Sequence, residues 1–426
     1  MTALRHERAV SPARPSSPEI RTAGRRRWLP VAAAMFCCGW GGNQFTPLLI
    51  MYRGAGYSTL MVDALLGAYV VGLVPGLLLS GGLSNRLGRK PVMIAGTVLS
   101  IMGSAMLALG GFGVAWIFCG RLVTGVAVAA AMAVGSTWIK ELADAAPGSP
   151  ANLGTRRAAL WLTLGLGIGP GVAGVLAQWG PWPMSLPYLV HLGLTVIALC
   201  LLPRSPDPYT SSRRARSRTT EEFPGSRAVT RLPMGLRHPR FSRVILPMAP
   251  WIFGSLGVAY AVMPQLVDSR LGSWSLAYST LLTVVSIGAG VGIQPLAKRL
   301  DRTGSARAVI VGMLAMICGL ALSAITAATR SPWLALVAAL VLGAAYGMAV
   351  VSGLLELQRL ARPNELAQLT GAYYALAYLG FLLPTLLAVL SPVAGYPTLL
   401  AGLTVLALGG TAVIMRHSRR HLPAPA

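Results

Sequence analysis

The sequence predicts an all-α integral membrane protein with twelve transmembrane helices in two six-helix bundles. Three observations lead to this fold class. Of the 426 residues, 54% are hydrophobic and only 11% are charged, whereas an ordinary soluble domain has roughly 25% charged residues. Twelve segments reach the length of about 20 mostly apolar residues that a membrane-spanning helix needs. Finally, features of the first six segments recur in the last six, which indicates two related halves.

The predicted helices follow one another with short connections, except for one long polar segment in the middle of the chain. Their expected ranges are 28–52, 59–82, 91–110, 113–139, 154–178, 184–202, 243–266, 274–297, 306–327, 332–356, 365–390 and 393–416. The middle segment is rich in Arg, Ser and Pro and is too charged to form a core. The predicted divisions are a tail (1–27), a first bundle (28–202), a linker (203–242), a second bundle (243–416) and a final tail (417–426).

The positive charge of the chain follows the predicted topology. All of the 36 Lys and Arg residues fall in the tails, the linker or the connections on one side, apart from Arg53, Arg121, Arg270 and Arg330. Loops that remain in the cytoplasm carry such an excess of basic residues. The net charge of +24 therefore reflects orientation, and no nucleic-acid partner is expected. We expect a multi-pass protein of a bacterial-type plasma membrane, with both termini in the cytoplasm.

One basic turn marks the cytoplasmic side most clearly. The stretch Gly81–Pro91 contains Arg86, Arg89 and Lys90 between two apolar runs. A similar stretch, Leu296–Arg302, occupies the same place in the second half. Pro170 in the fifth helix is likewise matched by Pro384 in the eleventh. The nearly equal spacing of the two matches predicts two halves in the same orientation, related by an axis along the membrane normal, with a polar path between them.

Three short motifs in this order resemble those of the major facilitator superfamily, over nearly the whole helical part of the chain. The first is Gly81-Gly-Leu-Ser-Asn-Arg-Leu-Gly-Arg-Lys90, the second is Arg121-Leu-Val-Thr-Gly125, and the third is Gly165-Leu-Gly-Ile-Gly-Pro170. The resemblance implies a secondary transporter. The third motif is associated within that family with proton-coupled antiporters that export drugs or metabolites. By the same resemblance, the first motif and its repeat form an inner gate made of Gly81, Asn85, Arg86, Gly88, Arg89 and Lys90 with Arg299, Asp301 and Arg302.

The sequence departs from the family pattern at two places. Asn85 stands where relatives usually have Asp, so a hydrogen bond can remain there while its charge-assisted part weakens. Helix one has Asn43 and Gln44 where many proton-coupled exporters have an acidic residue. The departures favour an alternative function, a facilitator or uptake permease without strict proton coupling.

Ionisable side chains at membrane depth are costly and are therefore candidates for coupling. Arg121 lies about eight residues into helix four, and Asp63 lies near the outer end of helix two. We hypothesise that the two form an ion pair or exchange partners through a proton or the substrate. The alternative is structural, with Arg121 bound to backbone carbonyls and Asp63 a hydrated carboxylate at a helix end.

Polar residues near the helix centres suggest a substrate cavity. Pro47 removes the helical donor for the carbonyl of Asn43, so a break in helix one is expected beside Asn43 and Gln44. His191 in helix six titrates near neutral pH when unperturbed. For all three residues, hydrogen bonding to a neighbouring helix is the alternative.

Aromatic residues of the second half would add walls to this cavity. The candidates are Tyr260 and Gln265 on helix seven, with Tyr374 and Tyr378 on one face of helix eleven. Aromatic walls with few fixed charges would suit an amphipathic or weakly cationic organic substrate. Tyrosine at membrane interfaces is also an ordinary anchor, so each assignment stays open.

Helix five is expected to pack closely against its neighbours. Gly165, Gly169 and Pro170 remove side-chain bulk along one seam. Such a seam is either a plain packing contact or a pivot for motion between conformations.

Several function classes are disfavoured. The sequence has no H-E-x-x-H or G-x-S-x-G motif and no nucleotide-binding loop, so no catalytic residues, metal or cofactor are expected. The expected partners are a small organic substrate, protons and the lipid bilayer, and the protein is expected to be monomeric. A transporter-like sensor or scaffold remains a further alternative.

Overall fold

The computed structural model describes residues 27–144, 153–207, 234–361 and 365–420. The described chain is helical apart from turns and one isolated bridge between Arg302 and Ser305. In this part of the chain, eleven helices are long and apolar enough to cross a membrane. The first predicted span is not among these eleven, because it is divided into two shorter helices. Most of the predicted tails and of the linker lies outside the described residues.

The described part of the first half contains eight α-helices, with short 3₁₀ and π-helical turns between some of them. The helices are α2 (Leu29–Asn43), α3 (Leu49–Gly54), α4 (Thr59–Leu87), α5 (Arg89–Ala108), α6 (Val114–Ala130), α7 (Ser136–Asp144), α8 (Leu153–Trp179) and α9 (Leu186–Leu201). The predicted break in helix one is present, because α2 ends at Asn43 and a 3₁₀ turn at Thr46–Leu48 precedes α3. A π-helical turn at Ala131–Gly135 joins α6 to α7 as one span.

The described second half forms six candidate spans, which are divided into more helices than those of the first half. The helices are α11 (Met234–Arg237), α12 (Leu246–Gly257), α13 (Met263–Val267), α14 (Ser275–Gly292), α15 (Gln294–Leu300), α16 (Arg307–Thr329), α17 (Pro332–Leu360), α18 (Leu366–Tyr378), α19 (Leu383–Leu390) and α20 (Tyr396–His417). A π-helical turn at Val258–Val262 joins α12 to α13. Arg240, assigned to the linker from the sequence, is buried against the second bundle.

The two halves also repeat their closest backbone contacts. A Cβ added at Gly165 on α8 would lie 2.1 Å from the carbonyl oxygen of Phe36 on α2. The corresponding Cβ at Gly380, between α18 and α19, would lie 2.1 Å from the carbonyl oxygen of Pro250 on α12. No side chain fits at either position, so the fifth and eleventh spans approach the first and seventh in the same way.

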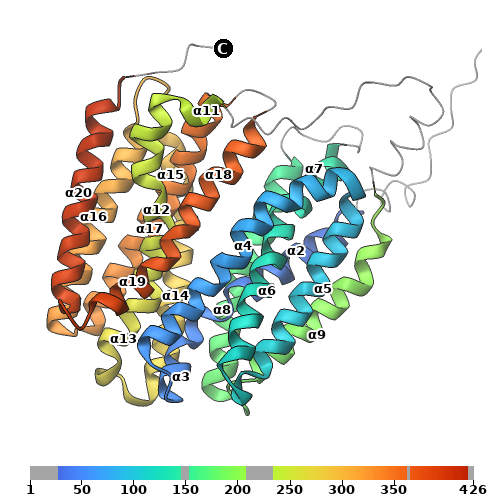
Figure 1. The fold of residues 1–426 in the computed structure, drawn as a ribbon, viewed down its shortest axis with the longest axis horizontal. Helices are drawn as coiled ribbons and strands as arrows, with labels where there is room; N and C mark the ends of the chain where they lie inside the picture. The colour runs from blue at the N-terminus through green and yellow to red at the C-terminus, as the bar shows by residue number, and fades with distance from the viewer. Residues whose placement is uncertain (1–26, 145–152, 208–233, 362–364, 421–426) are drawn as a thin grey trace, which may run out of the picture.

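The two bundles lie side by side and contact each other along two lines (Figure 1). α8 packs against α14 on one line, and α4 packs against α18 and α19 on the other. α7, α11 and the C-terminal end of α20 lie on one side of the molecule, which we call the linker side (Figure 1). The side that carries α3 and α13 is called the opposite side.

Candidate functional site

A cavity of about 570 Å³ lies between the two bundles. This volume is in the range of ligand pockets, roughly 300–1,000 Å³. Its lining begins at the break in helix one, with Asn43 and Thr46, and continues to residues at the linker side. There Lys140 and Gln358 line the cavity and are exposed. The cavity therefore opens on the linker side.

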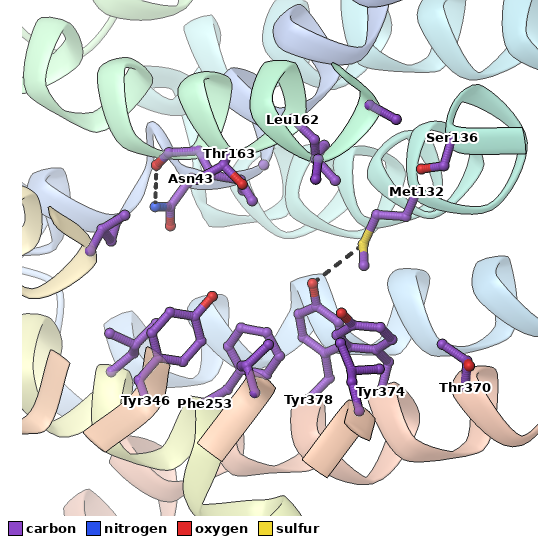
Figure 2. Close-up of a pocket in the computed structure, with 18 of the residues that line it drawn as sticks. Asn43, Met132, Ser136, Leu162, Thr163, Phe253, Tyr346, Thr370, Tyr374 and Tyr378 are labelled. Atoms are coloured by element: carbon purple, nitrogen blue, oxygen red, sulfur yellow. Dashed lines mark hydrogen bonds between the residues drawn. The ribbon is translucent and has the colours of Figure 1, made fainter. Parts of the chain in front are cut away.

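One wall of the cavity is aromatic and comes from the second half. Figure 2 shows Phe253, Tyr346, Tyr374 and Tyr378 projecting from it. The rings of Phe253 and Tyr378 are stacked with centroids 4.1 Å apart, and Phe381 stacks on Phe253 at 4.9 Å. Such contacts fix the ring planes, so this wall presents a rigid surface to a bound molecule.

The facing wall comes from the first half, and its side chains are smaller and more polar. Figure 2 shows Asn43, Met132, Ser136, Leu162 and Thr163 on this side. The Asn43 amide donates to the carbonyl oxygen of Leu166 at 2.8 Å and accepts from the Thr46 hydroxyl at 2.8 Å. The break in helix one is thus held open by side chains, and it places Asn43 at the cavity surface as the sequence predicts.

Arg121 lies at the closed end of this cavity, away from the linker side, and is 1% exposed. Its Nε donates to the carbonyl oxygen of Leu65 at 3.3 Å, and its Nη1 donates to that of Gly42 at 3.1 Å. Its guanidinium carbon lies 4.6 Å from the ring centroid of Phe45 and 4.7 Å from that of Tyr69. The predicted ion pair between Arg121 and Asp63 is absent from this structure, and Arg121 binds backbone carbonyls instead.

Two predicted cavity residues of the first half lie elsewhere. Gln44 is fully buried, and its amide donates to the Ser104 hydroxyl at 3.0 Å. Ser104 also lies 2.7 Å from His191 Nδ1, and His191 Nε2 lies 2.8 Å from the carbonyl oxygen of Cys37. The network joins three helices inside the first bundle and does not line the cavity. The placement of Gln44 and His191 in the cavity was wrong, because their helix faces point into the bundle.

Of the four predicted residues from the second half, three line the cavity. These are Tyr260, Tyr374 and Tyr378. Gln265 lies one helical turn beyond Tyr260, toward the opposite side, and does not line it. The Gln265 Nε2 is buried without a hydrogen-bond partner in the described chain.

Three aromatic residues of the cavity lining were not predicted from the sequence: Phe253, Tyr346 and Phe381. A signal for Phe381 was present, since it follows Tyr374 and Tyr378 at the spacing of one helix face.

The opposite side of the cavity is closed by contacts between the halves. Asp63 is fully buried and forms an ion pair with Arg53, whose Nη2 lies 2.6 Å from Asp63 Oδ1. Arg53 Nη1 also donates to the carbonyl oxygen of Ala261 in the second half at 3.4 Å. The Thr385 hydroxyl, from the second half, donates to the Asp63 carbonyl oxygen at 2.8 Å. Asp63 therefore takes part in the contacts that close this side of the cavity.

A second set of contacts closes the α8–α14 line near the same side. The Gln178 side chain donates to the carbonyl oxygen of Ser273 and accepts from the backbone N–H of Ala277, both at 2.9 Å. The rings of Trp179 and Trp274 meet edge to face at 6.4 Å. Gly169 packs on Trp40, and Pro170 is buried beside it, so the predicted seam of helix five faces α2.

On the linker side, the basic turn forms a network within the first half alone. α4 runs to Leu87 and α5 begins at Arg89, with Gly88 between them at φ +102°, a conformation that favours glycine. Arg89 bonds Glu141 at 2.9 Å, the Ser84 hydroxyl at 2.9 Å and Asn85 Oδ1 at 2.8 Å. Asn85 thus keeps the hydrogen bond expected of it. Of the other predicted gate residues, Gly81 and Arg86 lie in the last turns of α4, and Lys90 lies in the first turn of α5, where its Nζ donates to the Pro203 carbonyl oxygen at 2.5 Å.

The second half has a matching network. Asp301 pairs with Arg359, which also contacts Glu356 at 3.3 Å. Glu356 in turn pairs with the buried Arg240 at 2.6 and 2.8 Å. The other predicted gate residues, Arg299 and Arg302, are exposed. Each network stays within its own half, in keeping with a cavity that is open on this side.

Both the sequence and the fold resemble those of known proteins. The sequence model of the major facilitator superfamily matches residues 29–385. A chloramphenicol resistance protein from Pseudomonas aeruginosa is 25% identical over 298 residues. That match covers 67% of this chain, and the chain spans 65% of the length of that relative.

Solved structures of transporters have the same fold. The nucleoside transporter NupG matches with a TM-score of 0.67 at 16% identity, covering 91% of this chain and 98% of NupG. A peptide transporter, POT, in complex with sulfate gives 0.71 at 13% identity, covering 94% and 96%. A D-xylose–proton symporter gives 0.67 at 14% identity, covering 96% and 100%. The chain is a multi-pass membrane protein and belongs to the major facilitator superfamily.

Proposed function

We propose that this protein exports a small organic compound across the plasma membrane by alternating access, driven by a proton gradient. The observation that carries the proposal is the cavity between the two bundles. It is open on the linker side and closed on the opposite side by the Arg53–Asp63 pair and its contacts to Ala261 and Thr385. A site exposed to one side and sealed from the other by breakable contacts is what alternating access requires.

The linker side is assigned to the cytoplasm because the basic residues of the chain gather there. In this orientation the structure is open to the cytoplasm and ready to accept a compound from inside the cell. Export agrees with the third sequence motif and with the resistance function in the name of the Pseudomonas relative. The single chain carries a complete cavity, so we propose a monomer as the transporting unit.

Asp63 is the proposed proton acceptor. Among the described residues that line the cavity there is no Asp or Glu, so the coupling carboxylate must lie outside it. Asp63 lies in the gate that faces the outside, where the proton concentration would drive the cycle. A neutral Asp63 cannot form an ion pair with Arg53, so proton binding would weaken the closed gate.

The test is transport by purified protein in inverted proteoliposomes with an acidic interior. We expect at least one aromatic compound of a chemically varied panel to accumulate inside, and an uncoupler to abolish the accumulation. Asp63→Asn should still allow exchange of labelled for unlabelled compound while losing the response to the pH gradient. Accumulation by Asp63→Asn that keeps the full response to the gradient would overturn the role of Asp63.

A facilitator without strict proton coupling is the second candidate, and the absence of a carboxylate from the described cavity lining favours it. A facilitator equilibrates the compound across the membrane without concentrating it. Equal concentrations inside and outside the vesicles, unchanged by the uncoupler, would support this candidate over the exporter.

A further inference from the structure

We propose that the cavity selects aromatic compounds whose polar end carries negative charge, and that Arg121 binds that end. The proposal names the substrate class of the transporter proposed above and rests on that function. It replaces the expectation of a weakly cationic substrate, which relied on the aromatic residues of the sequence alone.

The charges of the cavity all have one sign. Among its described lining residues, Arg121 and Lys140 are the charged side chains, and both are basic. Arg121 lies at the closed end, and Lys140 lies at the open end on the linker side. Charged groups of one sign in a cleft with apolar walls raise the local concentration of the opposite charge. The cavity therefore attracts anions and repels organic cations along its whole length.

Arg121 differs from Arg240, which is also fully buried, in having no carboxylate partner in the described chain. Arg240 makes two short hydrogen bonds to Glu356. Arg121 has no ion pair within the described chain, and its Nη2 has no hydrogen-bond acceptor there. A buried charge is ordinarily paired, because removing it from water is costly. A negatively charged ligand group would supply the missing partner.

The surroundings of Arg121 hold the guanidinium in place without neutralising it. Two backbone carbonyls accept from Nε and Nη1, and the rings of Phe45 and Tyr69 lie over the group. These contacts leave the two N–H donors of Nη2 for a ligand. A planar guanidinium with free donors binds a carboxylate well, since the two groups match in shape and charge.

The aromatic wall lies next to this donor. The Tyr69 ring, 4.7 Å from the guanidinium carbon, is 6.4 Å from the rings of both Tyr378 and Phe381. These two rings belong to the stacked group that includes Phe253. A molecule with one or two aromatic rings and a short acidic arm can thus contact the wall and Arg121 together. The cavity volume of about 570 Å³ accommodates such a molecule.

The test uses three probes of nearly equal size that differ in charge: 2-naphthylacetate, 2-naphthylethanol and 2-naphthylethylammonium. Binding to the purified full-length protein is measured at equilibrium, without a membrane gradient, by isothermal titration calorimetry at low salt. We expect the acetate to bind at least tenfold more tightly than the ammonium, with the alcohol between them. Tighter binding of the ammonium than of the acetate would overturn the proposal.

Variants separate the role of Arg121 from general effects on folding. Arg121→Gln should remove the preference for the acetate, whereas Arg121→Lys should keep part of it. Asn43→Asp places a carboxylate on the cavity wall, one residue from the carbonyl that Arg121 binds, and should shift the preference toward the ammonium while Arg121 itself is kept. An unchanged acetate preference in both Arg121→Gln and Asn43→Asp would contradict the assignment.

The proposed substrate class and the proposed proton-driven export can each be refuted without the other. Preference for the acetate without any gradient-driven movement would leave the substrate class standing and remove proton-driven export. Gradient-driven accumulation of the ammonium probe, with no transport of the acetate, would leave proton-driven export standing and remove the proposed substrate class.

Discussion

Replacing Asp63 by Asn should open the gate on the opposite side. The Arg53–Asp63 pair is 2.6 Å long, with exposed fractions of 12% and 0% for the two side chains. It also positions Arg53 to donate to Ala261 across the halves. The amide of Asn still accepts a hydrogen bond, so the variant loses the ionic part of the interaction and keeps the neutral part.

The size of the effect follows from that difference. A hydrogen bond to a charged group contributes about 1.5–3 kcal/mol, against about 1 kcal/mol for a neutral one. A loss of about 2 kcal/mol, at the upper end of this difference, shifts the balance between closed and open gate by about 30-fold. The two backbone segments of the gate, residues 57–66 and 259–271, would be exposed to water more often by that factor.

Hydrogen–deuterium exchange detected by mass spectrometry measures this opening directly. We expect exchange in both gate segments to become faster by up to about 30-fold in Asp63→Asn. Asp268→Asn is the matched control, because Asp268 is an exposed carboxylate at the same side with no ion pair in the described chain. Equal exchange rates in Asp63→Asn and Asp268→Asn would refute the assignment of the pair as a gate.

Two further predictions concern stability and are read from the melting temperature of the purified protein. Glu356→Gln leaves the buried Arg240 without its charged partner and should cost about 3–5 kcal/mol, whereas Glu141→Gln breaks a pair whose side chains are 17% and 33% exposed and should cost about 0–1 kcal/mol. Equal melting temperatures for these two variants would contradict the role given to burial. Gly165→Ala forces α8 away from α2 and should cost about 1–3 kcal/mol, whereas Gly193→Ala adds a methyl group in open space and should change stability by less than about 0.5 kcal/mol. A Gly165→Ala protein as stable as Gly193→Ala would show that the close approach of the two helices is not required.

Much of the fold could be predicted because lipid imposes simple rules on the chain. Apolar segments of sufficient length marked the spans, and Pro47 marked the break in helix one. The close packing at Gly165 could also be predicted, since glycine in the helix-five motif indicates a close approach of helices. The structure shows this approach, which is to Phe36.

The site was harder to predict because polar residues in a spanning helix can face either the cavity or the bundle interior. His191 and Gln44 share a hydrogen-bond network inside the first bundle, and nothing in a single sequence states which way they turn. Asp63 was recognised as a candidate, yet its partner Arg53 is set by the turn between α3 and α4 and not by helix spacing. The charge of the cavity depends on which residues line it, so it became visible only in three dimensions.

The most direct test of coupled transport is proton movement caused by the compound itself. Proteoliposomes loaded with a pH-sensitive dye at equal internal and external pH are given a concentration gradient of 2-naphthylacetate. Exchange of protons for the compound predicts a change of internal pH that stops when the compound equilibrates and is absent in Asp63→Asn. Movement of the compound with no change of internal pH, or the same change in Asp63→Asn as in the native protein, would contradict proton-coupled export through this gate.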